Sequence, residues 1–312
     1  MKTLALLLAT VLALATLAAP PALAAAPTVE IKPTQLPRGA DVAIPHVVGK
    51  TIVDGDTRIP VRAKYVQLLG VSGDAYVVQV PYRVLRVTTE SREQVVRFRD
   101  GVDSLLSHDG EHVVLTAINQ RGRSTVRVLD AATGTEVATR TFRKWAVSLD
   151  ADGSEVALTA TKPDRTLRWD FDADRTHRIA RRAAGVVDFG ADRVSTFTRN
   201  PYLGGCTVIT SLSRPDQELW RSCREAVIRF SPDGERMVTT HKLADGPGPN
   251  RVTMRDASGT ALTKYRSSWF SGIEWESNTA LLLDANSRRL GATVRCELDE
   301  CERATRVRRT EV

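Results

Sequence analysis

Aromatic residues, histidines and cysteines are scarce in this chain of 312 residues. Phe, Trp and Tyr together make up 5% of it, and there are five histidines and four cysteines. The motifs HExxH, CxxC and GxSxG, which mark zinc proteases, structural zinc sites and α/β-hydrolase nucleophiles, do not occur. The sequence therefore indicates neither those sites nor a large aromatic-lined ligand cavity, and we expect no metal and no cofactor.

A long apolar run occurs once, at the N-terminus. Lys2 precedes an apolar stretch at residues 4–17, and Ala22-Leu23-Ala24 forms an A-x-A cleavage site. The run is shorter than the roughly 20 residues that span a bilayer, so a retained anchor is the weaker alternative. We predict a signal peptide at residues 1–24, cleaved after Ala24, and a secreted mature chain without a membrane span.

Acidic residues are almost as numerous as basic ones. The chain has 44 Lys and Arg against 37 Asp and Glu, which gives a net charge of +7. Arginines cluster at residues 178–182 and 303–309, but acidic residues interleave along the whole sequence and aromatic stacking partners are few. We therefore expect no nucleic acid as partner, whereas a weak attraction to anionic polymers of the cell envelope is compatible with the charge.

A short phrase with a Gly/Asp turn recurs about every 40 residues. An apolar stretch precedes each copy and an alternating strand follows it; the copies are VSGDAYVV (71–78), SHDGEHVV (107–114), DADGSEVA (150–157), DFGADRVS (188–195), SPDGERMV (231–238) and the degenerate EWESNTALLL (274–283). A period near 40 residues with about four strands per unit is typical of a β-propeller.

Six full repeats fit between residues 61 and 308. A Pro-containing arm at residues 25–43 and a short strand pair at 45–61 precede them. The strand pair completes a seventh blade or caps one face, and the sequence leaves both open. We predict an all-β protein, a single ring of six to seven four-stranded blades at residues 44–312, and a monomer.

Two passages resemble known propeller repeats. SPDGERMV, preceded by AVIRF, resembles the WD40-like repeat of TolB-type propellers, and VRVLDAATGTEVA (126–138) is similar to a passage common to WD40 and quinoprotein propellers. The resemblance implies a propeller with a surface that binds other proteins. The Trp-Asp ending of WD40 repeats is absent, and so is the Trp that follows the Thr-Gly turn in quinoprotein repeats, so a quinone cofactor is not implied.

The cysteine spacing predicts two disulfides within blades. Cys296 and Cys301 flank a tight hairpin with Leu298-Asp299 at its tip. If residues 206–211 pair antiparallel with 218–223, Cys206 faces Cys223. Free thiols and a metal site are the alternatives, and the CxxC spacing that zinc would require is missing.

Two connections between the second and third strands of their repeats are unusually long, TRNPYLGG (198–205) and HKLADGPGPNR (241–251). Binding residues gather on such loops when a rigid scaffold holds them. Arg199, Tyr202, His241 and Arg251 are the candidate binding residues, and tolerated insertion is the alternative for each.

Two functions are compatible with these features. The first is a secreted, non-enzymatic propeller that binds a protein or an envelope polymer through its loops. The second is a hydrolase or lyase with a small site at the mouth of the channel. The first predicts no converging acid, base and metal groups at that mouth, whereas two or more carboxylates or histidines within about 4 Å of each other there would favour the second. Each histidine is interpreted as a surface or turn residue, and the carboxylates at 150–152 and 170–174 as ordinary turns, since no EF-hand spacing is present. We favour the non-enzymatic hypothesis.

Overall fold

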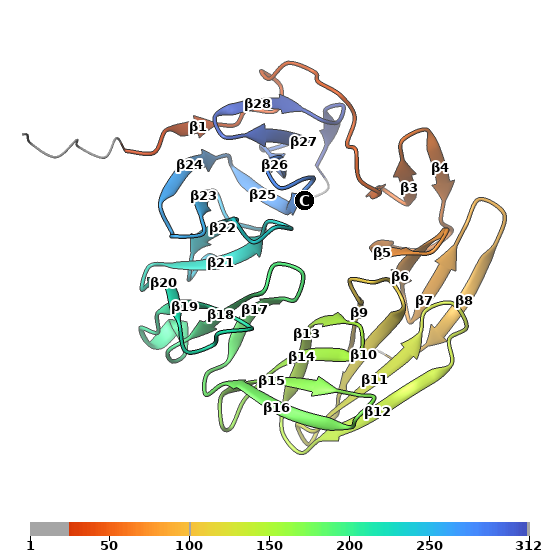
Figure 1. The fold of residues 1–312 in the computed structure, drawn as a ribbon. Helices are drawn as coiled ribbons and strands as arrows, with labels where there is room; N and C mark the ends of the chain where they lie inside the picture. The colour runs from red at the N-terminus through yellow and green to blue at the C-terminus, as the bar shows by residue number, and fades with distance from the viewer. Residues whose placement is uncertain (1–24, 100, 311–312) are drawn as a thin grey trace, which may run out of the picture.

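The computed structural model, which describes residues 25–99 and 101–310, is a ring of seven antiparallel sheets around a central axis (Figure 1). The strands of the first three blades are β2 (His46–Val48), β3 (Thr51–Asp54) and β4 (Thr57–Pro60); β5 (Gln67–Ser72), β6 (Ala75–Val80), β7 (Arg83–Val87) and β8 (Arg92–Arg97); and β9 (Val102–Leu106), β10 (His112–Ile118), β11 (Ser124–Asp130) and β12 (Glu136–Phe142).

The strands of blades four and five are β13 (Ala146–Asp152), β14 (Glu155–Ala160), β15 (Arg165–Asp170) and β16 (Arg175–Ala180); and β17 (Ala184–Asp188), β18 (Arg193–Phe197), β19 (Thr207–Ser211) and β20 (Glu218–Ser222). Those of blades six and seven are β21 (Glu225–Phe230), β22 (Arg236–His241), β23 (Arg251–Asp256) and β24 (Ala261–Arg266); and β25 (Trp269–Trp275), β26 (Leu281–Asn286), β27 (Leu290–Glu297) and β28 (Glu300–Arg303). The short strand β29 (Arg308–Arg309) pairs with β27.

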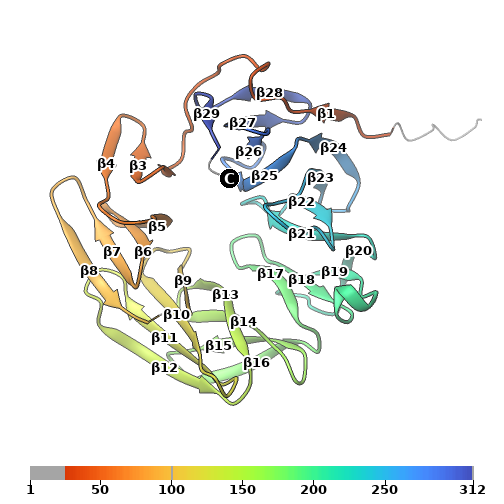
Figure 2. The ribbon, with the colours of Figure 1, turned by 180° about the vertical axis from the view of Figure 1, so that it is seen from behind.

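The protein is therefore a seven-bladed β-propeller, and the predicted all-β ring is confirmed. Six blades are four-stranded meanders, and the segment before them forms a three-stranded first blade. Of the two possibilities left open for that segment, a seventh blade is the one observed. Seen from behind, the same ring runs in the opposite sense (Figure 2).

The core lies between neighbouring blades. Along a strand, every second side chain points into the space between blades. In β11, for example, Val126 and Val128 are fully buried and Arg127 points outward. Between blades two and three, Val77 and Val84 pack with Leu115 and Leu129. Burying a Val or Leu side chain contributes about 1.5–3 kcal/mol to folding, so these apolar contacts stabilise the packing of neighbouring blades against each other.

The first and last blades share no strand. Blade one and blade seven are each built from one contiguous segment, and the N-terminal arm runs along the outside of the ring (Figure 1). β1 (Thr28–Glu30) pairs in parallel with the edge strand β24, and Arg38 forms an isolated bridge with Arg303. The segment before the first blade is thus docked on the ring through β1 and Arg38, while the bounds predicted for the arm at 25–43 and for the propeller at 44–312 stay predictions. The predicted signal peptide lies outside the described residues.

Both expected disulfides are present. Cys206 is joined to Cys223 and Cys296 to Cys301. Thr207 pairs with Ser222 and Val208 with Arg221, which is the register that the cysteine positions require. Cys296 and Cys301 are partners across the β27–β28 hairpin.

Successive strands of a blade run in opposite directions, so successive connections alternate between the two faces of the ring. The turns between first and second and between third and fourth strands lie on one face, here called the turn face. The connections between second and third strands, and from one blade to the next, lie on the other face, here called the loop face. None of the described residues belongs to a helix long and apolar enough to cross a membrane.

Candidate binding face

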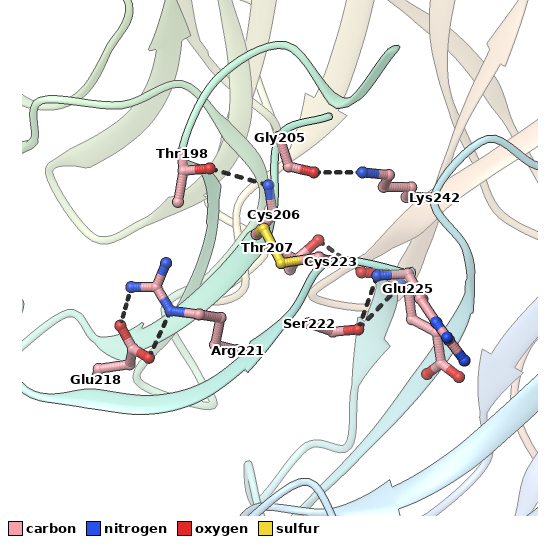
Figure 3. Close-up of a disulfide and its surroundings, with 11 residues drawn as sticks. Thr198, Gly205, Cys206, Thr207, Glu218, Arg221, Ser222, Cys223, Glu225 and Lys242 are labelled. Atoms are coloured by element: carbon pink, nitrogen blue, oxygen red, sulfur yellow. Dashed lines mark hydrogen bonds and ion pairs between the residues drawn. A yellow bond between two sulfur atoms is a disulfide. The ribbon is translucent and has the colours of Figure 1, made fainter. Parts of the chain in front are cut away.

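The two long loops adjoin each other on the loop face. The β18–β19 connection (198–206) contains the 3-10 helix η1 (Pro201–Leu203), and the β22–β23 connection covers residues 242–250. Lys242 Nζ donates to the carbonyl oxygen of Gly205 at 2.6 Å, so a side chain of blade six fixes the backbone of blade five (Figure 3).

The sequence of the first loop makes it rigid. The side-chain oxygen of Asn200 caps η1 by accepting a hydrogen bond from the Tyr202 N–H at 2.9 Å, and Gly204 ends it in the left-handed conformation (φ 83°). A Cβ at Gly205 would lie 1.9 Å from the Arg199 carbonyl oxygen, so only glycine fits there. The Cys206–Cys223 disulfide anchors the base of the loop (Figure 3).

This rigid loop presents two apolar side chains to solvent. Tyr202 is 68% exposed and Leu203 is 70% exposed, and no other large hydrophobic residue in the described part of the chain exceeds half exposure. Single exposed apolar residues are common on soluble proteins, but Tyr is enriched among the residues that dominate binding at interfaces, so Tyr202 is the stronger contact candidate of the pair.

The structure divides the four predicted binding residues into two pairs. His241 and Arg251 line a cavity of about 660 Å³ on the loop face, together with Asp245 and Trp269. Arg199 and Tyr202 lie on the adjoining loop and do not line that cavity. The two loops touch through Lys242 and Gly205, so one partner could span both pairs. Their role in binding stays a prediction.

Exposed aromatic residues gather on the same face. Tyr82 lies in the β6–β7 connection and Trp145 in the β12–β13 connection, and Tyr65 leads into β5. Together with Tyr202 they are the four exposed Tyr, Trp and Phe residues of the described chain. Basic side chains flank them, and Trp145 shares a cavity of about 500 Å³ with Arg121, Lys144 and Lys162. Sequence reasoning identified only Tyr202 among these four.

Charge is sorted between the two faces. The loop-face connections of blades two to seven carry the basic residues Arg99, Arg121, Arg123, Arg143, Lys144, Lys162, Arg181, Arg182, Arg199, Arg224, Lys242, Arg288 and Arg289. Among the described residues of these connections, the acidic ones are Asp164 and Asp245. The loop-face connections are therefore strongly cationic.

The turn face has the opposite composition. Its connections in the same blades carry the acidic residues Asp74, Glu90, Asp109, Glu111, Asp172, Asp174, Asp192, Asp216, Asp233, Glu235, Glu276 and Asp299. Arg214 is the one arginine there, and no lysine accompanies it. The acidic and basic residues of the connections, which interleave along the sequence, thus lie on different faces, because each strand carries the chain from one face to the other.

The cations of the loop face are not neutralised by neighbouring carboxylates. Across residues 25–99 and 101–310, none of the basic side chains of the loop-face connections forms an ion pair, whereas arginines elsewhere in the blades commonly do. Almost all of them are exposed, and Arg182 and Lys242 are half-buried. Their charge is therefore available to a partner.

A polar cluster on the turn face joins three consecutive blades. His108 follows β9, and its Nε2 lies 2.9 Å from Asp150 Oδ2 and 3.9 Å from Asp188 Oδ1. The Phe189 N–H also donates to Asp150 Oδ2, at 2.7 Å. The hydrogen bond with Asp150 raises the pKa of His108 to about 9, and burial raises the pKa of the Asp188 carboxyl.

This cluster meets the distance condition for the enzymatic hypothesis. A protonated imidazole beside two carboxylates can donate a proton, and the three residues together offer one nitrogen and two oxygen ligands within 4.8 Å of one another. Sequence reasoning treated His108 and Asp150 as ordinary turn residues. The missed signal was their placement, since all three flank the first turn of consecutive repeats.

Comparisons with known proteins support the fold. No family model matches the chain, and no curated protein matches it. Among solved structures, the β-propeller domain of the Trilobed protease from Pyrococcus furiosus, described as having an open velcro topology, aligns with a TM-score of 0.56 at 10% identity and covers 86% of this chain and 98% of that one. A chain of the Mitotic Checkpoint Complex aligns with a TM-score of 0.57 at 11% identity and covers 89% and 88%.

A third structure is that of an enzyme. The acylaminoacyl peptidase of Pyrococcus horikoshii aligns with a TM-score of 0.60 at 9% identity over 82% of this chain, but this chain spans only 47% of the peptidase. Identities this low carry no information about activity. The comparisons place the chain among β-propellers, in agreement with its seven observed blades.

Proposed function

We propose that this protein is a secreted, non-enzymatic β-propeller that binds a protein or an anionic polymer of the cell envelope through its loop face. The observation that carries the proposal is the rigid platform of Tyr202 and Leu203, the two most exposed large apolar residues in the described chain. Ordering entropy is lost during folding and not on binding, because the Asn200 cap, the hydrogen bond from Lys242 to Gly205 and the disulfide already hold the loop.

Three further features support this function. The pattern at residues 1–24 is that of a signal peptide, and the two disulfides fit an oxidising, extracellular environment. The SPDGERMV repeat is similar to those of TolB-type propellers, a relationship that we include in the proposal.

The test is capture of partners from the native envelope and culture fluid. The variant Tyr202→Ala/Leu203→Ala removes the exposed pair, and Val137→Ala, on the outer strand β12, is the matched control because Val137 is 47% exposed. We expect the control to recover the same partners as the parent protein and the double variant to lose them. Equal recovery by all three would refute a binding role for this platform.

A small active site on the turn face is the second candidate, and the contacts of His108 with Asp150 and Asp188 favour it. It predicts hydrolysis or elimination of an envelope polymer by the purified protein. Turnover should be lost in His108→Asn and unchanged in Tyr202→Ala/Leu203→Ala. Product analysis by mass spectrometry would detect the reaction. If His108→Asn retained full turnover, His108 would have no place in catalysis.

A further inference from the structure

We infer that the partner of the loop face is an anionic polysaccharide, which lies across the loops of several blades. This inference rests on the proposed function and narrows its partner to one class. Three observations carry it: the sorting of charge between faces, the absence of ion pairs among the loop-face cations, and the exposed aromatic residues between them.

Because basic residues predominate in its connections, the loop face has a positive electrostatic field that reaches further than any single contact. Arg121 and Lys144 flank Trp145, and Arg181, Arg224 and Arg288 continue the cations through the following blades. Charges in water interact over a Debye length of about 8–10 Å at moderate salt, so cations from one blade to the next act together on a polymer. A small anion would use only one or two of them.

The unpaired state of these cations lowers the cost of binding. A guanidinium that already has a carboxylate partner must exchange it, whereas the loop-face arginines lose only water. Arginine, which predominates on this face, donates two parallel hydrogen bonds to a carboxylate, sulfate or phosphate group. The acidic turn face repels the same polymer, so binding is confined to one side of the ring.

The aromatic residues point to sugar rings. Tyr65, Tyr82, Trp145 and Tyr202 are exposed on the loop face between its cations. The C–H groups on the flat side of a pyranose pack on an aromatic ring, while its hydroxyl and anionic groups reach the neighbouring cations. Bases of single-stranded nucleic acid stack in the same way, but the two disulfides fit an oxidising, extracellular environment, where polysaccharide is the expected polymer.

The test uses alginate as the carboxylated polysaccharide, dextran sulfate as the sulfated one, neutral dextran, and a single-stranded oligothymidylate. The affinity of the purified protein for each polymer is measured at salt concentrations from about 50 to about 300 mM, a roughly sixfold range of ionic strength. We expect alginate or dextran sulfate to bind with a Kd that rises linearly with salt on logarithmic axes. Neutral dextran should not bind, and the oligonucleotide should bind more weakly than the polysaccharides.

The variant Arg121→Gln/Lys144→Gln removes two cations of the loop face. Its control, Arg178→Gln/Arg214→Gln, removes the same charge from exposed arginines of strand β16 and of the turn face. We expect the first variant to raise the Kd for alginate about tenfold or more and the control to change it less than about twofold. Trp145→Ala should weaken binding without changing the salt slope, because it removes contact area and no charge.

Three results would overturn the inference: no polysaccharide bound at 50 mM salt, equal losses of affinity in the two charge-removing double variants, or tighter binding of the oligonucleotide than of the polysaccharides. The proposed function is judged separately by the Tyr202→Ala/Leu203→Ala capture experiment. If that variant loses a protein partner while the parent protein ignores both polysaccharides, the binding function stands and the polysaccharide does not.

Discussion

Lys242 Nζ lies 2.6 Å from the carbonyl oxygen of Gly205, and this hydrogen bond joins the long loops of blades six and five. Lys242 follows His241, and Gly205 closes the loop that bears Arg199 and Tyr202. Two pairs of predicted binding residues, about 40 positions apart in sequence, are therefore neighbours through one contact.

Replacing Lys242 by Met should loosen the loop face without unfolding the ring. Methionine keeps the apolar stem but cannot donate to Gly205, so the 198–206 loop loses one brace. We expect the cooperative unfolding midpoint to stay within a few degrees and partner capture to weaken several-fold, because the loop must then be ordered on binding. Amide hydrogen exchange of residues 198–206 would measure the loosening. Unchanged exchange there would show that the disulfide and Asn200 suffice.

The free energy of unfolding should fall at alkaline pH as His108 loses its proton. Its pKa is raised to about 9 by the hydrogen bond with Asp150, against about 6.5 in an unfolded chain. A raised folded-state pKa stabilises the native protein fully below pH 6.5, and this contribution is lost as the pH rises through about 9. Urea unfolding between pH 6 and 10 should show it, and His108→Gln should flatten the profile. A parallel profile in the variant would contradict this role.

The arm should be released when its buried clamp is broken. Arg295, with 13% of its side chain exposed, pairs with Glu276, with 6% exposed, and donates to the carbonyl oxygens of Ala40 and Asp41. Arg295→Ala leaves the buried Glu276 carboxylate without a charged partner and with the Ala43 N–H as its remaining donor, which costs about 3 kcal/mol. Urea denaturation measures the loss, and limited proteolysis should then cut near residue 40.

The exposed pair of Arg266 and Glu30 provides the control for the clamp. It also ties the arm to the ring, but both side chains are about half exposed, so Arg266→Ala should cost less than about 1 kcal/mol. Comparable losses in the two variants would mean that burial does not set the strength of the clamp.

The two disulfides should contribute unequally to stability. Cys206 and Cys223 are separated by 17 residues in sequence and Cys296 and Cys301 by 5. Loop entropy predicts about 3 kcal/mol for the longer loop and about 2 kcal/mol for the shorter one. Chemical denaturation of the two Cys→Ser double variants would rank them, and non-reducing peptide mapping would verify both pairs. A larger loss at the short loop would contradict the entropic ranking.

The fold was predictable because the signal repeats. Each turn with a Gly/Asp motif specifies one hairpin, and six copies about 40 residues apart specify a ring even where single copies have decayed. The cysteine positions predicted the β19–β20 register because only one antiparallel alignment brings Cys206 and Cys223 together. The first blade was ambiguous since its strands are short and carry only part of the repeat.

The character of the faces was not predictable from composition. Arg181 and Asp192 are near neighbours in sequence, yet strands β17 and β18 begin and end on different faces, so one belongs to the cationic loops and the other to the acidic turns. A count of charge over any short stretch of sequence includes both residues, so the opposite charges of the two faces cancel in it. His108 and Asp150 escaped notice for the related reason that contact between them depends on how adjacent blades are placed, which no local pattern contains.

The alternation of connections between the two faces gives the ring an electric axis as well as a geometric one. A body that is positive at one end and negative at the other turns as it drifts toward an anionic layer, so it would arrive with Trp145 and Tyr202 leading. Once the protein is bound, its acidic turn face would face the solvent. A layer of bound protein would therefore present negative charge, the same sign as the anionic polymer that it covers.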